Sequence, residues 1–86
     1  MIKNYLPLVH AIIDAVLFLE SSGSDQVNPD SAVQCMENIA SSLLRLEKSD
    51  QIALRTHFEE IAEKARDQAY KNFVLAMPDS IGLASS

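Results

Sequence analysis

Cysteine, glycine and proline are all scarce in this 86-residue chain, which has one cysteine, two glycines and three prolines. The single cysteine, Cys35, excludes a disulfide within the chain and indicates a reducing compartment, so we expect a cytoplasmic protein. We expect Cys35 itself to be a small buried side chain. With only Gly23 and Gly82, the sequence has no glycine-rich loop to hold phosphate groups.

Basic residues are also outnumbered, with seven Lys and Arg against twelve Asp and Glu and a net charge of −5. This charge repels nucleic-acid phosphates and anionic lipids, so neither nucleic acid nor membrane is an expected partner. The apolar run from Lys3 to Leu19 is interrupted by His10 and Asp14, so we expect neither a signal peptide nor a membrane span there. A basic protein surface is the partner that the charge favours.

The remaining composition, 48% hydrophobic and 22% charged, is that of a globular domain. Hydrophobic periodicity predicts an all-α fold, a small three- to four-helix bundle formed by residues 1–86 as one domain. The first helix is expected at about 5–21, with Asn4 as its N-cap and Pro7 in its first turn. The loop that follows contains Gly23, which we expect to take the left-handed conformation that ends a helix.

A second helix is expected at about 29–47, because Asn28 followed by proline is typical of a helix start. A third is expected at about 50–66, capped by Ser49 or Asp50. The link between these two helices is short, which predicts that they pack as an antiparallel αα-hairpin.

A fourth helix is expected at about 68–77, with Asp67 as its N-cap, although periodicity also allows the third helix to continue through this point. Pro78 is expected to end it, because proline lacks the amide that continues a helix. The tail, 78–86, contains two apolar residues that we expect to fold back onto the bundle, Ile81 and Leu83.

Candidates for catalysis or metal binding are few. His57, Glu60 and Glu63 are spaced one helical turn apart, but a metal site in a bundle takes ligands from several helices, and no second motif matches. We therefore expect a solvated charged face, with no metal or other cofactor. No serine lies in a nucleophile motif, so we do not expect an enzyme.

Two sets of residues are candidates for binding other chains. The outer face of the third helix is acidic and lies near an aromatic residue, and its candidate partner-binding residues are Glu59, Glu60, Glu63 and Tyr70. The first helix is apolar over more than the roughly 100° to 180° of one helix that a small monomeric bundle can cover, which predicts self-association as a symmetric dimer. Its candidate residues are Leu6, Val9, Ile13 and Leu17. In a monomer, the C-terminal segment would have to cover this helix instead.

Two short segments resemble known helical proteins. The sequence Thr56-His57-Phe58-Glu59-Glu60 resembles a segment of small acidic bacterial immunity proteins, such as the colicin-DNase immunity proteins, which are similar in size, acidity and four-helix design. The adjacent tyrosine pair with which those proteins grip their toxin is missing here. The sequence Ala32-Val33-Gln34-Cys35-Met36-Glu37 resembles part of the dimerising N-terminal domain of small glutamine-rich TPR co-chaperones.

Together these features predict a protein-binding module. The immunity resemblance implies a stoichiometric inhibitor that covers a basic toxin or effector domain with its acidic surface. The alternative is a helical homodimerisation or adaptor domain with no inhibitory role, which the apolar first helix favours.

Overall fold

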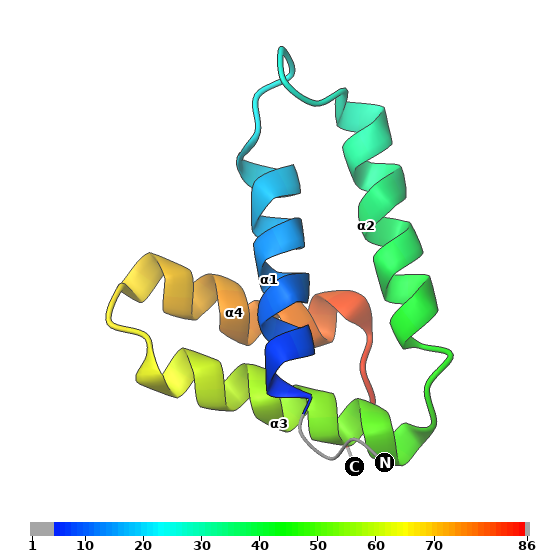
Figure 1. The fold of residues 1–86 in the computed structure, drawn as a ribbon, viewed down its shortest axis with the longest axis vertical. Helices are drawn as coiled ribbons and strands as arrows, with labels where there is room; N and C mark the ends of the chain where they lie inside the picture. The colour runs from blue at the N-terminus through cyan, green and yellow to red at the C-terminus, as the bar shows by residue number, and fades with distance from the viewer. Residues whose placement is uncertain (1–4, 86) are drawn as a thin grey trace.

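The computed structural model describes residues 5–85, which form four α-helices and no strand. These helices are α1 (Leu6–Ser21), α2 (Pro29–Leu43), α3 (Lys48–Lys64) and α4 (Gln68–Ile81). In Figure 1, α3 and α4 lie side by side, α1 crosses them, and α2 stands next to α1. The predicted all-α fold is confirmed, and α3 and α4 are separate helices.

Two helix starts are fixed by the caps that the sequence predicts. The side chain of Asn28 accepts hydrogen bonds from the amides of Asp30 and Ser31, at 2.9 and 3.1 Å, at the start of α2. The Asp67 carboxylate accepts from the amide of Tyr70 at 2.8 Å at the start of α4. Both caps satisfy amides that have no partner within the helix, and the Asp67 cap marks the break between α3 and α4.

The start of α1 and its following loop agree only in part with the prediction. The expected cap, Asn4, lies outside the described residues, and Tyr5 occupies the N-cap position without a side-chain cap bond. Pro7 lies in the first turn as expected. Gly23 does not adopt a positive φ, so the predicted left-handed helix end is wrong there. The loop is closed instead by a turn in which the Gly23 carbonyl accepts from the amides of Gln26 and Val27.

The second helix stops earlier than the predicted 29–47, because α2 ends at Leu43. The Gln51 side chain explains this stop, since its amide donates to the carbonyls of Leu44 and Leu46, at 3.2 and 2.9 Å. A side chain of α3 thus satisfies carbonyl groups in the turn that have no partner within a helix.

The third helix is shifted from the predicted 50–66 to Lys48–Lys64. Ser49 and Asp50 therefore lie in the first turn of α3 and do not cap it. Glu47 occupies the N-cap position with no side-chain cap bond. The acidic Asp50 still suits the first turn, where the helix dipole favours negative charge, and it also accepts a hydrogen bond from the Tyr5 hydroxyl at 3.4 Å.

Pro78 does not end α4, contrary to the prediction of a helix at 68–77, because the helix continues through it to Ile81. Its ring is buried, which offsets the backbone hydrogen bond that proline cannot make. Gly82 ends the helix with a φ of 93°, and the amides of Gly82 and Leu83 both donate to the Pro78 carbonyl at 3.0 Å. This left-handed glycine turns the tail back over the bundle.

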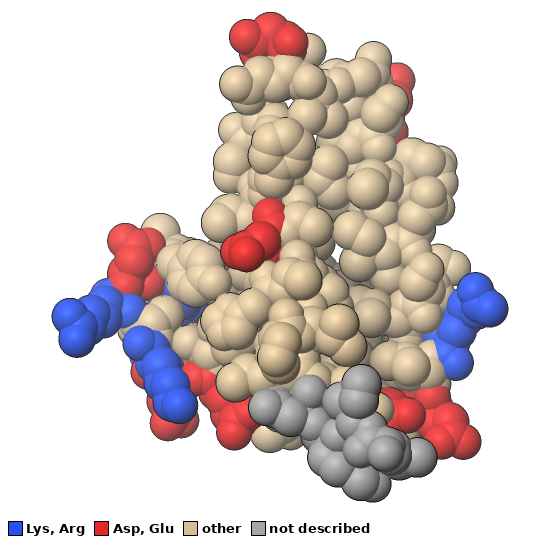
Figure 2. All heavy atoms as spheres, in the orientation of Figure 1, with Lys and Arg blue, Asp and Glu red and all other residues tan. Residues whose placement is uncertain are grey.

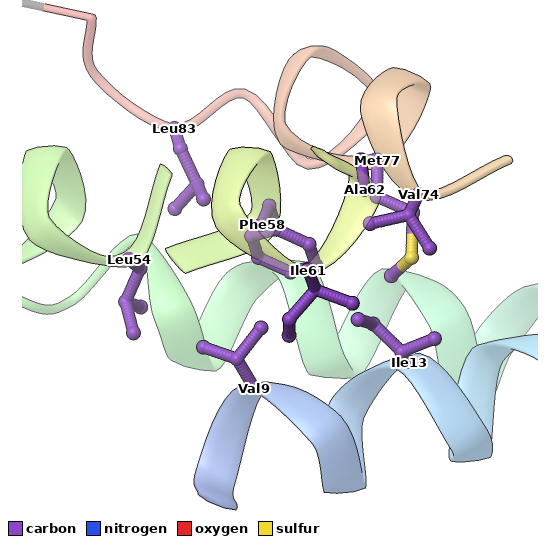
Figure 3. Close-up of a cluster of buried hydrophobic side chains, with 9 residues drawn as sticks. All are labelled: Val9, Ile13, Leu54, Phe58, Ile61, Ala62, Val74, Met77 and Leu83. Carbon is purple, nitrogen blue, oxygen red and sulfur yellow. The ribbon is translucent and has the colours of Figure 1, made fainter. Parts of the chain in front are cut away.

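The core is one apolar cluster between α3 and α4, with α1 laid across it (Figure 3). Phe58 lies at its centre with no exposed surface. The cluster takes residues from α1, α3, α4 and the tail but none from α2. Its buried members are Val9, Ile13, Leu54, Phe58, Ile61, Ala62, Val74, Met77 and Leu83.

The helix pairs differ from the predicted pairing of 29–47 with 50–66. The most extensive helix contact is between α3 and α4, followed by the contacts of α1 with α3 and with α2. α2 and α3 are joined by a short turn as expected. However, α3 runs across the direction of α2 and does not return alongside it, so the two helices do not form an antiparallel hairpin (Figure 1). The reason is that α3 presents Phe58, Ile61 and Ala62 to α4, whereas α2 packs on α1.

The tail folds back as predicted, and polar contacts hold it in place. Leu83 is buried in the core and Ile81 packs against it. The Arg55 guanidinium donates to the carbonyl of Leu83 at 2.6 Å and to that of Ala84 at 3.2 Å. The same guanidinium pairs with Asp79 at 3.0 Å, so one side chain of α3 links the end of α4 to the tail.

The core assignment predicts opposite outcomes for the same substitution at two phenylalanines. Phe58→Ala should lower the free energy of unfolding by about 3–5 kcal/mol, because it leaves a cavity in the cluster. Phe18→Ala, at a side chain that is 59% exposed, should lower it by less than about 1 kcal/mol. Urea unfolding followed by circular dichroism measures both, with Phe58→Leu as a milder core variant. A similar loss of unfolding free energy in the two alanine variants would contradict the assignment of Phe58 to the core and of Phe18 to the surface.

The two glycines provide a second matched pair. Gly82→Ala should destabilise the protein by about 1–2 kcal/mol, because an L-residue is strained at this left-handed φ. Gly23→Ala should change stability by less than about 0.5 kcal/mol, since its new methyl group meets only the exposed Asp25 carboxylate, which can move aside. Thermal unfolding tests the pair, and an equally stable Gly82→Ala variant would contradict the helix end described here.

Candidate protein-binding surface

The predicted acidic face lies on the outside of α3, but its negative charge is partly neutralised. Glu59, Glu60 and Glu63 are all exposed. The Glu60 carboxylate interacts with His57 Nδ1 at 2.8 Å. Lys64 lies one helical turn after Glu60 on the same face of α3. The field of this face is therefore weaker than three carboxylates would produce alone.

Two of the predicted partner-binding residues meet in one hollow between α1, α3 and α4. Glu60 and Tyr70 both line it, whereas Glu59 and Glu63 lie outside it. The hollow measures about 400 Å³ and is completed by Leu6, His10, Ile61, Lys64 and Ala65. It is large enough for a side chain of a partner, with one acid and one base at its edge.

The predicted self-association residues do not form a surface. Val9 and Ile13 have no exposed area because they lie in the chain's own core, against α3 and α4. Leu6 and Leu17 are half-buried. The prediction that these four side chains face a second copy is thus corrected for Val9 and Ile13, which the C-terminal segment helps to cover within one chain.

The exposed apolar side chains of α1 lie on its opposite side. Leu8 and Phe18 are 55% and 59% exposed. With Ala11 and Ala15, which are also exposed, they recur at the three- and four-residue spacing of one helix face. We call these four residues the α1 stripe.

A second unfilled apolar surface lies between α1, α2 and α4, and we call it the α2 groove. It arises because α2 buries only Ala32, so its larger apolar side chains stay half-buried. The hollow measures about 290 Å³. Its lining residues are Val16 and Glu20 of α1, Met36, Ile39 and Ala40 of α2, and Phe73, Ala76, Met77, Ser80 and Ile81 of α4.

The α2 groove continues toward the loop between α1 and α2. A neighbouring hollow of about 290 Å³ shares Glu20 and Met36 with it and is otherwise mostly apolar. Its remaining lining residues are Leu19, Ser22, Val27, Pro29, Ala32 and Val33. The two hollows together follow α2 for several turns.

The α1–α2 half of the chain, which supplies two of the three helices of this groove, carries most of the net negative charge. Residues 5–44 contain five acids and no Lys or Arg, whereas residues 45–85 contain seven acids against six bases. In the view of Figure 2, Lys and Arg lie at the level of α3 and its flanking turns, and the face over α1 and α2 shows none. The acidic region is therefore the α1–α2 half. The prediction from the sequence placed the acidic surface on the third helix because it did not compare the charges of the two halves of the chain.

The described residues contain no arrangement suited to metal binding. No group of three His, Cys, Asp or Glu side chains in residues 5–85 lies close enough to hold an ion. Every buried side chain in this part of the chain is apolar. Cys35 is exposed on α2, which corrects the prediction that it is buried. Within the same residues, no helix has the length and hydropathy needed to cross a membrane.

Metal removal should leave the protein unchanged. Because His57 and Glu60 interact with each other and no third ligand joins them, we expect the same melting temperature with and without EDTA. A ligand that binds the native state raises its stability by mass action, so a clear drop in EDTA would reveal a bound metal. Differential scanning fluorimetry makes the comparison, with Mg²⁺-saturated EDTA as the control.

Comparisons of the chain with protein-family models, with curated proteins and with solved structures found no match.

Proposed function

We propose that this chain is a protein-binding module that docks its partner in the α2 groove. The observation that carries the proposal is the incomplete burial of α2. Met36, Ile39 and Ala40 line the groove on one face of this helix, yet each remains half-buried, as does Phe73 of α4 in the same lining. A partner that covered these side chains would complete a core that the chain leaves open.

The energetic reason is the hydrophobic effect. Burying a large apolar side chain fully is worth about 1.5–3 kcal/mol, so covering the half-exposed groove side chains contributes a substantial part of a binding free energy. The half-buried methionine in the lining, Met36, has a flexible and polarisable side chain that can adapt to the shape of an incoming side chain.

We propose further that the module acts as a stoichiometric inhibitor of the immunity type. The acidic α1–α2 half supports this, because it would be attracted to the basic surface of a toxin or effector domain and would raise the rate of association. The proposal makes binding itself the activity, in which one chain occupies one target and blocks its function.

A second candidate is a homodimerisation or adaptor domain, and the α1 stripe favours it. Leu8 and Phe18 expose more than half of their surface, and a symmetric dimer would place the two stripes against each other. Light scattering separates the candidates. A mass of about twice 9.5 kDa that returns to 9.5 kDa in Phe18→Asp would support the dimer, and a stable 9.5 kDa species at high concentration would exclude it.

Site-specific photo-cross-linking in the source cells tests the proposed docking surface. A benzoylphenylalanine at Ala76, which is exposed and lines the α2 groove, should yield one discrete adduct with a partner. The matched control places it at Leu75, which is exposed on α4 and is not among the lining residues of the groove, and should yield none. Adducts of equal strength at both positions, or no adduct at Ala76, would contradict the proposal.

A further inference from the structure

We infer that the occupant of the α2 groove is a basic amphipathic helix of the partner. This inference rests on the proposed function and adds the secondary structure and the charge of the bound segment. The groove supplies two constraints on its occupant, the spacing of its walls and the sign of the charge around it.

The spacing matches the face of a helix. Met36, Ile39 and Ala40 on α2 follow the three- and four-residue repeat, and so do Phe73, Met77 and Ser80 on α4. A third helix laid in a groove of this kind inserts residues at i, i+3, i+4 and i+7. Hollows of about 290 Å³ hold side chains rather than a whole helix, so the partner would contribute one apolar face.

Other modes of peptide binding do not suit this surface. An extended segment binds by adding a strand to a sheet edge, and residues 5–85 contain no strand. A polyproline segment docks on a row of aromatic rings, whereas the lining of the groove has one aromatic side chain, Phe73. A helix in the groove is the mode that remains.

The charge selects a basic segment over a second copy of this chain. Glu20 is the one charged residue in the groove lining, and no cation accompanies it. Glu37 on α2 is also exposed, and residues 5–44 carry no Lys or Arg to neutralise these carboxylates. A copy of this chain docked through the same half would bring five more acids against these five, whereas Lys or Arg beside the partner's apolar face would be attracted.

Two designed peptides test the inference. One is a helix of about 18 residues with Leu at i, i+3, i+4 and i+7 and Lys elsewhere, and the other has Glu in place of Lys. Fluorescence anisotropy measures their binding to the full chain. The Leu/Lys peptide should bind at least about tenfold more tightly than the Leu/Glu peptide, because only its charge complements the α1–α2 half.

Matched variants locate the binding in the groove. Ala76→Lys should lower the affinity for the Leu/Lys peptide by about tenfold or more, because it places a cation and a longer side chain in the lining. Leu75→Lys, at an exposed position of the same helix outside the lining, should change the affinity by less than about twofold. Glu20→Lys should weaken it more than Glu59→Lys at low salt, and this difference should shrink at about 1 M salt, where the screening length is about 3 Å. Circular dichroism confirms that all four variants remain helical.

Three results would overturn the inference. The first is that the Leu/Lys peptide does not bind, and the second is that the two peptides bind equally. The third is an equal loss of affinity in the two variants of either matched pair, which would show general attraction between opposite charges. The proposed function is tested separately by the cross-link at Ala76. A native partner that cross-links there through an acidic or extended segment would refute the basic helix and leave the docking surface standing.

Discussion

The packing of α3 against α4 around Phe58 is the contact on which the other elements depend. Both helices supply fully buried side chains to it, and the residues that α1 contributes, Val9 and Ile13, are buried in the same cluster. The tail depends on it as well, since Arg55 on α3 holds the backbone at Leu83. Removing this contact would therefore expose the buried faces of α1 and the tail together.

The two halves of the chain differ in their share of the core and in their charge. The α3–α4 half contains most of the core and has nearly balanced charge, whereas α2 adds a single buried alanine and lies in the acidic half. An element that buries little contributes little to the stability of the folded state, and this is why we place the proposed docking surface on α2. The apolar groove and the surrounding acids are compatible because the acids lie on exposed positions and only Glu20 enters the lining.

The candidate site shows why the total charge of the chain does not predict where its acidic surface lies. The predicted acidic face on α3 contains three exposed carboxylates, but His57 and Lys64 lie beside Glu60. The α1–α2 half carries its five acids without a single Lys or Arg, and this can be counted directly along the sequence. The groove cannot be predicted by counting residues along the sequence, since its walls come from three helices.

The sequence by itself determined the features that depend on near neighbours. The all-α class, the start of α2 at Asn28 and the break at Asp67 follow from hydrophobic periodicity and from caps whose hydrogen bonds span two or three residues. Only the tertiary structure decided which apolar residues of α1 are buried, which helices pair, and that α4 continues through Pro78. Each of these depends on residues distant in the chain, because α3 and α4 select the buried face of α1, and burial of the Pro78 ring offsets its missing hydrogen bond.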